Sequence, residues 1–299
     1  MDKRLLAMLA AFGATAIYGI NHTVAKGLMP IYIKPYGLIL LRVLGASILF
    51  WIISIWGPKE RIDKKDWKRI FFCVITGMSI NMLMFFKGLS LSTPINSSII
   101  ITLSPILVFL MSAIAIKERI TLIKYLGIAL GLSGALSLIL YNTEIRNDAP
   151  NILLGNTMFI INAIIYGVYL IIVKPLTAKY HPFTLMKWLF FIAIFINLPV
   201  TANEFLEVQW RSLPFEAIWK LSFVVIGTTF LTYLLNIFAL RELKASTLAV
   251  FIYMQPLIGI VFAITSGSDT LNFIKIGSAV LIFTGVYLVT KKPKAKVSA

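Results

Sequence analysis

The sequence predicts an all-α integral membrane protein with ten transmembrane helices arranged as two inverted five-helix repeats. Three observations predict this fold: the hydrophobic content, the spacing of the apolar runs, and a similarity between the two halves of the chain. Of the 299 residues, 59% are hydrophobic and 13% are charged, and the mean hydropathy is +0.89. A soluble domain of this length would expose too much apolar surface to stay dispersed. The charged residues cluster between the apolar runs, which places the runs in a bilayer.

Each apolar run is about one bilayer long, at about 1.5 Å of helix rise per residue. The stretch Ser97–Leu140 shows the pattern clearly, because two runs flank the short charged hinge Lys117–Arg119. The glycines Gly127, Gly131 and Gly134 in the second of these runs predict a close approach between helices in lipid. The ten runs are Leu5–Lys26, Tyr36–Trp56, Ile70–Phe86, Ile95–Ile116, Leu122–Leu140, Ile152–Val173, Phe183–Ala202, Ile218–Leu240, Ser246–Ser266 and Phe273–Thr290.

The basic residues predict the orientation. Of the 28 Lys and Arg residues, 20 flank the runs on one side of the membrane, seven lie on the other side, and Arg42 falls inside a span. Because basic loops stay in the cytoplasm, we expect a multi-pass protein of the cytoplasmic (plasma or inner) membrane with both termini cytoplasmic. The orientation in the membrane explains the excess of basic residues that gives the net charge of +16. Nucleic-acid binding is not expected, since no contiguous soluble basic face exists. The single cysteine, Cys73, excludes an intrachain disulfide.

The first half of the chain recurs in the second half. The predicted repeats cover residues 5–140 and 152–290, with the polar linker Tyr141–Asn151 between them. Five helices are an odd number, so the second copy enters the membrane from the opposite side. Such inverted repeats are typical of secondary transporters, whose substrate site lies near mid-membrane between the halves. The matched residues are Tyr18-Gly19 with Tyr166-Gly167, Lys26 with Lys174, Pro105 with Pro256, Glu118 with Asp269, Lys124 with Lys275 and Gly134 with Gly285.

Several motifs resemble the EamA-type repeat of the drug/metabolite transporter superfamily. Pro105 in an apolar helix, the hinge KERIT and the helix GIALGLSGALSLI are similar to the end of such a repeat. AIYGINHTVAK, LILLRVLGASILF and NMLMFFKGLSLST resemble its first three helices, with Arg42 at the family's usual arginine. The second half departs at Ser266–Asn272, where the family has a Gly-Glu hinge. The resemblance implies metabolite transport in the export direction, most commonly of amino acids and related compounds.

No catalytic or metal-binding constellation is present in the sequence, so we expect neither an enzyme nor a cofactor. An intramembrane protease or metal enzyme needs buried carboxylates or metal-spaced histidines. The two histidines, His22 and His181, lie far apart in the chain, and all twelve acidic residues fall in predicted loops or termini. Because cation exporters driven by protons usually need a buried carboxylate, a cationic substrate is disfavoured. His22 is the only conventional candidate for proton linkage, with a neutral hydrogen-bond partner as its alternative role.

Polar residues spaced three or four apart share one face of a helix, and four predicted helices carry such stripes. We interpret them as the lining of a water-filled substrate pathway, with helix–helix hydrogen bonding as the alternative. The predicted pathway residues are Tyr18, Asn21, His22, Asn81, Thr102, Asn162, Tyr166, Tyr169, Thr229, Thr232, Tyr233, Asn236, Tyr253 and Gln255.

Three further residues are assigned gating or structural roles. Pro105 and Pro256 each remove a backbone hydrogen bond, which predicts bending points for gating or simple curvature around a cavity. Arg42 is assigned a structural or gating role, with binding of an anionic group or snorkelling toward the interface as alternatives.

The sequence therefore predicts a secondary transporter that exports a small polar metabolite, such as an amino acid, by alternating access. The expected partners are the lipid bilayer and a zwitterionic, anionic or neutral polar solute. Because no predicted span contains a carboxylate, we expect facilitated transport or exchange driven by the gradient of the solute itself. The alternative is a non-transporting membrane sensor or scaffold. Extended soluble domains would have supported that alternative, and the sequence has none.

Overall fold

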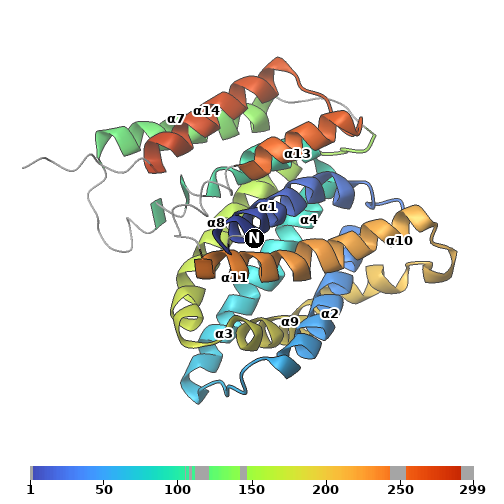
Figure 1. The fold of residues 1–299 in the computed structure, drawn as a ribbon. Coiled ribbons are helices and arrows are strands. Elements are labelled where there is room, and N and C mark those ends of the chain that lie inside the picture. The colour runs from blue at the N-terminus through green and yellow to red at the C-terminus, as the bar shows by residue number, and fades with distance from the viewer. Residues whose placement is uncertain are drawn as a thin grey trace, which may run out of the picture.

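A computed structural model describes residues 3–104, 106–107, 110–111, 121–141, 147–242 and 254–290 of the chain (Figure 1). The described residues form ten apolar helical segments, as the sequence predicts. In chain order these are α1 (Lys3–Lys26), α2 (Pro35–Ile53), α3 (Trp67–Cys73) with η3 (Val74–Ile80) and α4 (Asn81–Leu91), α5 (Pro94–Ile101), α7 (Leu122–Tyr141), α8 (Ile152–Lys179), α9 (Pro182–Leu206), α10 (Phe215–Ser222) with η5 (Phe223–Leu231) and α11 (Thr232–Glu242), α13 (Met254–Thr265) and α14 (Phe273–Thr290).

Six of the segments are long and apolar enough to cross a membrane by length and composition. Leu122–Ser137, Met254–Thr265 and Phe273–Leu288 are shorter apolar helices. The third span is longer than predicted, because a helical stretch runs from Lys64 to Leu91. In the predicted span Ile95–Ile116, α5 gives way to a turn at Thr102, and most of the remainder lies outside the described residues.

Local sequence explains where several helices begin. Proline occupies the first turn of α2, α5 and α9, where its missing N–H costs no hydrogen bond. Thr93 precedes α5 and its side chain accepts a hydrogen bond from the Asn96 amide. Asn151 does the same for the Leu154 amide at the start of α8. These are ordinary N-cap contacts that satisfy free amide groups.

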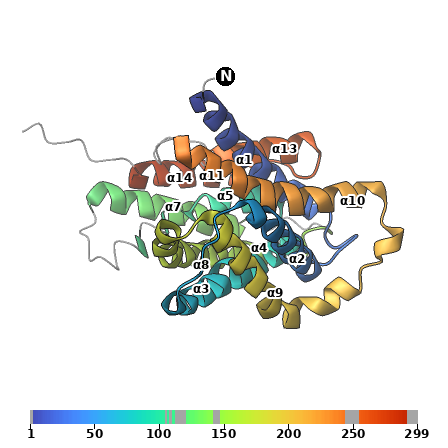
Figure 2. The same ribbon diagram turned by 60° about the horizontal axis from the view of Figure 1, so that its bottom comes forward.

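The helices pack in pairs that join the two halves. α7 packs along α14, α2 along α9, and α5 against α13, so the fifth, second and fourth spans each contact their counterparts. The third span of each half also contacts the first span of the other, as α4 with α8 and α11 with α1. In Figure 1, α7 and α14 lie at one edge and α2 and α9 at the opposite edge. Figure 2 shows the same bundle after rotation, with α4 near its centre.

Glycines let α7 and α14 pack closely. A Cβ atom on Gly285 would lie 2.5 Å from the carbonyl oxygen of Gly127, and one on Gly134 would lie 2.8 Å from that of Ser278. A Cβ on Gly131 would lie 2.3 Å from a methyl carbon of Ile106. The close approach predicted from the glycines of this helix is therefore confirmed.

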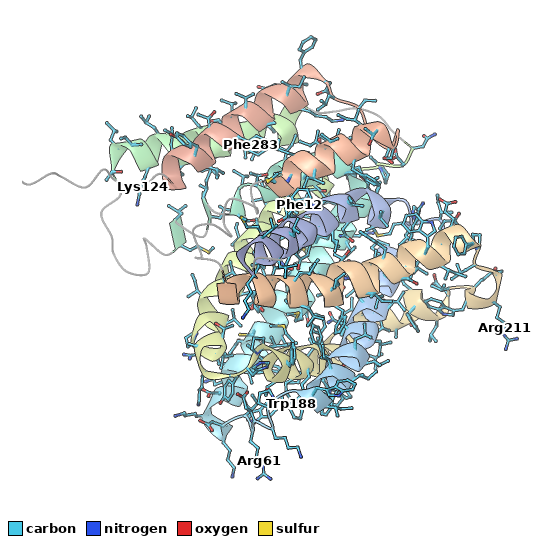
Figure 3. The ribbon with its side chains drawn as sticks, viewed as in Figure 1. Phe12, Arg61, Lys124, Trp188, Arg211 and Phe283 are labelled. Carbon is cyan, nitrogen blue, oxygen red and sulfur yellow. The ribbon has the colours of Figure 1, made fainter. Side chains whose placement is uncertain are left out.

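The outer surface of the bundle is apolar and matches a bilayer. Large hydrophobic side chains such as Phe273, which is 95% exposed, project outward. Lys124 and Arg211 lie at opposite ends of the bundle in Figure 3, with the apolar Phe12 and Phe283 between them. A soluble protein rarely exposes such large contiguous apolar patches, so this surface faces lipid.

Candidate functional site between the two halves

Four tyrosines and one arginine from both halves gather inside the bundle. Tyr18 comes from α1, Arg42 from α2, Tyr166 and Tyr169 from α8, and Tyr233 from α11. The four hydroxyl groups lie within electrostatic range of one another, and those of Tyr18 and Tyr233 lie within the same range of the Arg42 guanidinium. We call these five residues the tyrosine–arginine cluster. Because α1 and α2 belong to the first half and α8 and α11 to the second, the cluster spans the junction between the halves.

The members of this cluster differ in burial. Tyr166 is 39% exposed, yet its hydroxyl interacts with that of Tyr18 across the cluster. Its ring centroid lies 6.0 Å from that of Tyr169, which is buried. Tyr18 and Tyr233 are half-buried, as is Gln255 at the start of α13. The cluster therefore extends from the buried Tyr169 to the partly exposed Tyr166 on α8.

Arg42 is buried within the cluster and has few partners. Its side chain is 8% exposed, and its Nε donates a hydrogen bond to Thr229 Oγ1 at 2.9 Å. The guanidinium carbon lies 4.8 Å from the ring centroid of Phe86, a cation–π contact. Among the described residues, no other hydrogen bond and no ion pair engages this side chain. A charged group inside a membrane is costly, so an arginine without a carboxylate is a candidate functional residue.

The partner of Arg42 is positioned by a π-helix. Within η5, the Thr229 hydroxyl donates to the carbonyl of Val224, five residues earlier, at 2.9 Å. A hydroxyl has one hydrogen, so Thr229 Oγ1 is left to accept from the Arg42 Nε. π-Helical turns are rare and often occur at functional sites. Here the wide turn supplies the acceptor that orients the guanidinium.

The first half contains a matching π-helix, η3, whose Gly77 corresponds to Gly227 of η5 in the sequences VITG and VVIG. A Cβ atom on Gly77 would lie 2.4 Å from Cδ2 of Tyr169. A Cβ on Gly227 would meet nothing closer than 3.4 Å. The glycine of η3 therefore makes room for one ring of the tyrosine–arginine cluster.

His22 forms a buried hydrogen bond on α1. Its Nδ1 lies 2.5 Å from Ser97 Oγ, and its ring makes an edge contact with Phe85. The Ser97 hydroxyl also bonds to the carbonyl of Pro94 at 3.0 Å. Since a hydroxyl has one hydrogen, this pattern assigns the donor role to Nδ1. His22 therefore has a hydrogen-bond partner inside the bundle, which is one of the two roles that the sequence left open.

Other pathway residues bridge neighbouring helices. Asn81 and Asn162 are reciprocal partners, each side chain donating to the backbone carbonyl of the other, at 3.3 and 2.8 Å. Asn21 accepts a hydrogen bond from Thr228 at 3.0 Å. In these positions the helix-packing alternative describes the contacts that the structure contains. Their role as a pathway stays a prediction.

The remaining pathway and gating residues divide between the interior and the undescribed part of the chain. Thr232 and Thr102 are buried and each donates to a carbonyl of its own helical segment, Thr232 to Thr228 and Thr102 to Ser98. Asn236 is half-buried on α11, and Pro256 is buried in the first described turn of α13. Pro105, Tyr253 and the hinge glutamate Glu118 lie outside the described residues.

One acidic residue is more buried than its loop position suggests. Asp269 lies between α13 and α14, in a loop as predicted, but its side chain is 0% exposed. It pairs with the equally buried Lys275 at 2.9 Å, and its second oxygen accepts a hydrogen bond from the Ile95 amide at 3.1 Å. Lys275 also donates to the carbonyl of Thr270 at 2.8 Å. This ion pair fixes the α13–α14 loop to the start of α5, away from the tyrosine–arginine cluster.

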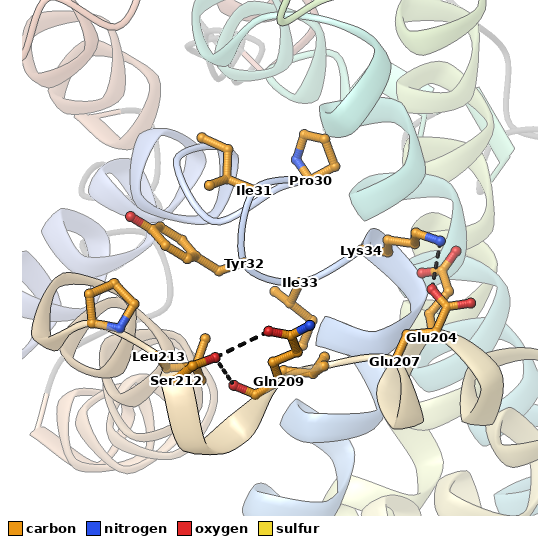
Figure 4. Close-up of a pocket in the computed structure, with 12 residues that line it drawn as sticks. Pro30, Ile31, Tyr32, Ile33, Lys34, Glu204, Glu207, Gln209, Ser212 and Leu213 are labelled. Carbon is orange, nitrogen blue, oxygen red and sulfur yellow. Dashed lines mark hydrogen bonds and ion pairs between the residues drawn. The ribbon is translucent and has the colours of Figure 1, made fainter.

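A surface pocket of about 400 Å³ lies between the α1–α2 and α9–α10 connections (Figure 4). Its charged groups have partners: Lys34 pairs with Glu207 at 2.6 Å, and Glu204 accepts hydrogen bonds from the amides of Tyr36 and Gly37. The hydrogen bond and attraction of Glu207 raise the pKa of Lys34 above its ordinary value. None of the predicted pathway residues lines this pocket. It joins two connections at the end of the bundle.

Sequence reasoning missed three features of the site region. The π-helices were not anticipated, although the match of Gly77 with Gly227 is a signal for them. The ion pair between Asp269 and Lys275 was not anticipated either. Its signal is the recurrence of an acid and a lysine six residues apart in both halves. The contact of Arg42 with Thr229 has no signal in a single sequence, because a helical stripe does not identify the neighbouring helix.

Comparison with known proteins identifies the family. A model described as the EamA-like transporter family matches residues 5–140 and 153–291. A protein of Archaeoglobus fulgidus named "Uncharacterized transporter" is 26% identical over 290 residues, which cover 96% of this chain and 98% of that protein. "Uncharacterized transporter YyaM" of Bacillus subtilis is 23% identical over 228 residues, 76% of this chain and 74% of that protein.

A solved structure supports the fold independently. A crystal structure shares the fold with a TM-score of 0.62 and 16% sequence identity, over 95% of each chain. Together with the apolar helices and the match in both halves, these findings show a multi-pass membrane protein. The chain belongs to the EamA-like transporter family.

Proposed function

We propose that this protein carries a small polar metabolite across the cytoplasmic membrane by alternating access, with the solute bound at the tyrosine–arginine cluster. The observation that carries the proposal is this cluster, which joins both halves and is partly exposed at Tyr166. In inverted-repeat transporters the substrate site lies at the junction between the repeats. The hydroxyl and guanidinium groups suit a zwitterionic, anionic or neutral polar solute.

The moving units of this proposal are the two repeats, residues 5–140 and 152–290. The π-helices η3 and η5 support it, because each lies within the third span of its repeat and borders the cluster. Non-α-helical turns of this kind mark places where a helix deforms at a functional site. Pro105 and Pro256 are the further proposed bending points.

The proposed direction is export, driven by the gradient of the solute itself. The tyrosine–arginine cluster contains hydroxyls and a guanidinium, and none of its residues is a carboxylate that exchanges protons. His22 is held by a buried hydrogen bond between its Nδ1 and Ser97.

Transport by purified protein in liposomes tests the proposal. Vesicles containing the full chain are loaded with a panel of L-amino acids and organic acids, and efflux is compared with protein-free vesicles. We expect saturable efflux of at least one compound, with no requirement for an imposed pH gradient. Absence of transport for the whole panel, with the protein shown to be folded, would favour the sensor or scaffold alternative.

The coupling is tested in the same vesicles. An imposed pH gradient without a solute gradient is expected to give no accumulation. Accumulation that disappears with a protonophore and also in His22→Ala would assign the proton to His22. Accumulation that survives this substitution would point to a carboxylate, with Glu118 the first to examine.

The proposed orientation has its own test. A reporter fused after Ala299 is expected to report from the cytoplasm, because 20 basic residues lie on the side of the termini against seven on the other. A matched fusion in the α9–α10 connection, after Arg211, is expected to report from outside. The reverse pattern would overturn the orientation.

A further inference from the structure

We infer that Arg42 binds the carboxylate group of the transported solute. This inference rests on the proposed function and narrows its substrate class to small metabolites that carry a carboxylate. The starting point is the number of free donors. A guanidinium has five N–H groups, and in Arg42 only the Nε–H has a partner among the described residues.

Within the part of the chain that the structure describes, the terminal nitrogens of Arg42 have no hydrogen-bond partner. Thr229 holds the Nε, and the Phe86 ring covers one face of the guanidinium at 4.8 Å. A guanidinium held in this way keeps its terminal N–H pair in a fixed plane. Two parallel N–H groups match the two oxygens of a carboxylate, which is the bidentate arrangement that arginine forms with planar anions.

Two other buried cations, Lys26 and Lys275, differ from Arg42 in the partners of their charged groups. The Lys26 ammonium donates to the carbonyls of Leu89, Ser90 and Asp148. The Lys275 ammonium pairs with the Asp269 carboxylate and donates to the carbonyl of Thr270. Both lysines are therefore satisfied by the protein. Among the described residues, the Arg42 guanidinium contacts the Thr229 hydroxyl and the Phe86 ring and has no carboxylate partner. We therefore assign its charge to the binding of a ligand.

The surroundings of Arg42 select a small solute that is polar at one end. The hydroxyls of Tyr18 and Tyr233 interact electrostatically with the guanidinium and can donate to a bound carboxylate. The rings of Tyr166 and Tyr169 offer apolar and π surface beside them.

A purely structural role for Arg42 predicts a different set of hydrogen bonds. An arginine that serves packing is expected to use its terminal nitrogens within the protein, because buried donors without partners are destabilising. The substitution of such a residue lowers stability and affects all ligands equally. A carboxylate-binding arginine instead discriminates between a carboxylate and its carboxamide.

The test uses the purified full-length protein in detergent and follows thermal unfolding. The 20 common L-amino acids are screened, and each compound that raises Tm is compared with its carboxamide and with the carboxylic acid that lacks the amino group. We expect both carboxylates to raise Tm and the carboxamide to have no effect. Arg42→Gln is expected to weaken carboxylate affinity at least tenfold, and Arg42→Lys to retain an intermediate affinity. Lys34→Gln, which removes an exposed cation at the end of the bundle, is the matched control and is expected to bind like the native protein.

Thr229→Val keeps the charge of Arg42 and removes the acceptor of its Nε, so it tests the site if Arg42→Gln fails to fold. We expect a several-fold loss of carboxylate affinity with the preference over the carboxamide retained. Equal binding of carboxylate and carboxamide, or native affinity in Arg42→Gln, would overturn the inference and leave transport itself intact. A panel with no ligand by Tm and no transport in liposomes would overturn both the inference and the proposed function.

Discussion

Two of the buried cations in the bundle, Lys275 and Arg42, have different surroundings. The side chain of Lys275 is 0% exposed and has a carboxylate at 2.9 Å and a carbonyl at 2.8 Å. Arg42 is 8% exposed and has one hydroxyl and one aromatic ring. The first is compensated within the protein and fixes a loop to α5. The second is oriented without being compensated.

This comparison shows that a protein can bury a charged side chain without neutralising its charge. A buried ion pair is stable because each charge replaces its water with the partner, and the loss of one partner leaves an uncompensated charge. A lone buried charge is retained at a cost and marks a functional site. If Arg42 is such a residue, its removal should affect the ligand far more than the fold, and the reverse should hold for Lys275.

The largest expected effect is on stability at the ion pair. Lys275→Met leaves the Asp269 carboxylate buried without its partner, so we expect a loss of about 3–5 kcal/mol in the free energy of unfolding. Arg42→Met removes a charge that lacks a carboxylate and is expected to cost less than about 1 kcal/mol, or to stabilise. Unfolding of the purified variants in detergent measures both.

The double variant Asp269→Leu/Lys275→Met provides the control, because replacing both charges with apolar groups is expected to recover most of the loss. Equal destabilisation by Lys275→Met and Arg42→Met would show that the two cations are equivalent and would remove the basis of the comparison.

An intermediate effect is expected where η3 makes room for the cluster. In Gly77→Ala the new Cβ would lie 2.4 Å from Cδ2 of Tyr169, so we expect overpacking to cost about 1–3 kcal/mol and to displace a ring beside Arg42. Gly227→Ala is the matched control in η5, where the nearest atom is at 3.4 Å. It is expected to leave unfolding and ligand affinity unchanged. Tm and carboxylate affinity are measured on both variants. A fall of both quantities in Gly77→Ala alone would show that η3 supports the cluster. Matching results in the two variants would separate η3 from the site.

The smallest effect is expected for an exposed cation. Lys34 and Glu207 are 54% and 55% exposed, and exposed pairs contribute little, so Lys34→Gln is expected to shift Tm by about 1 °C or less. Because Glu207 raises the pKa of Lys34, the contribution is present below the ordinary lysine pKa of about 10.4. It is lost as the pH rises through the higher pKa of the folded state. Thermal unfolding from pH 7 to 11 should therefore bring the native protein and the variant together at high pH. A difference that grows with pH would contradict this sign.

The sequence predicted the spans and part of the packing because these depend on local composition. Apolar runs identify the helices, and Gly127 and Gly134 predicted a close approach to another helix, which the structure shows to be α14. Arg42 stood out as the basic residue within a span. Its partners could not be predicted, because Thr229 is 187 positions away and reaches Arg42 only through the packing of η5 on α2.

The same limit explains the polar stripes. Residues spaced three or four apart were known to share a face, but that spacing does not identify what the face touches. Asn81 and Asn162 turned out to be partners of each other. Asp269 was assigned to a loop correctly, and its burial depends on the position of α5, which a single sequence does not give.

Chemical restoration of the positive charge at position 42 tests directly whether this charge binds the solute. Arg42→Cys is prepared in a Cys73→Ala background and reconstituted in liposomes, and transport of a carboxylate identified in the panel is measured. The cysteine is then modified with a methanethiosulfonate that attaches an ethylammonium group, or with one that attaches a neutral methyl group, and modification is verified by mass spectrometry. We predict low transport in Arg42→Cys, recovery with the ammonium reagent and none with the neutral reagent. Equal transport before and after both treatments, or a cysteine that neither reagent reaches, would contradict a solvent-reached carboxylate site at Arg42.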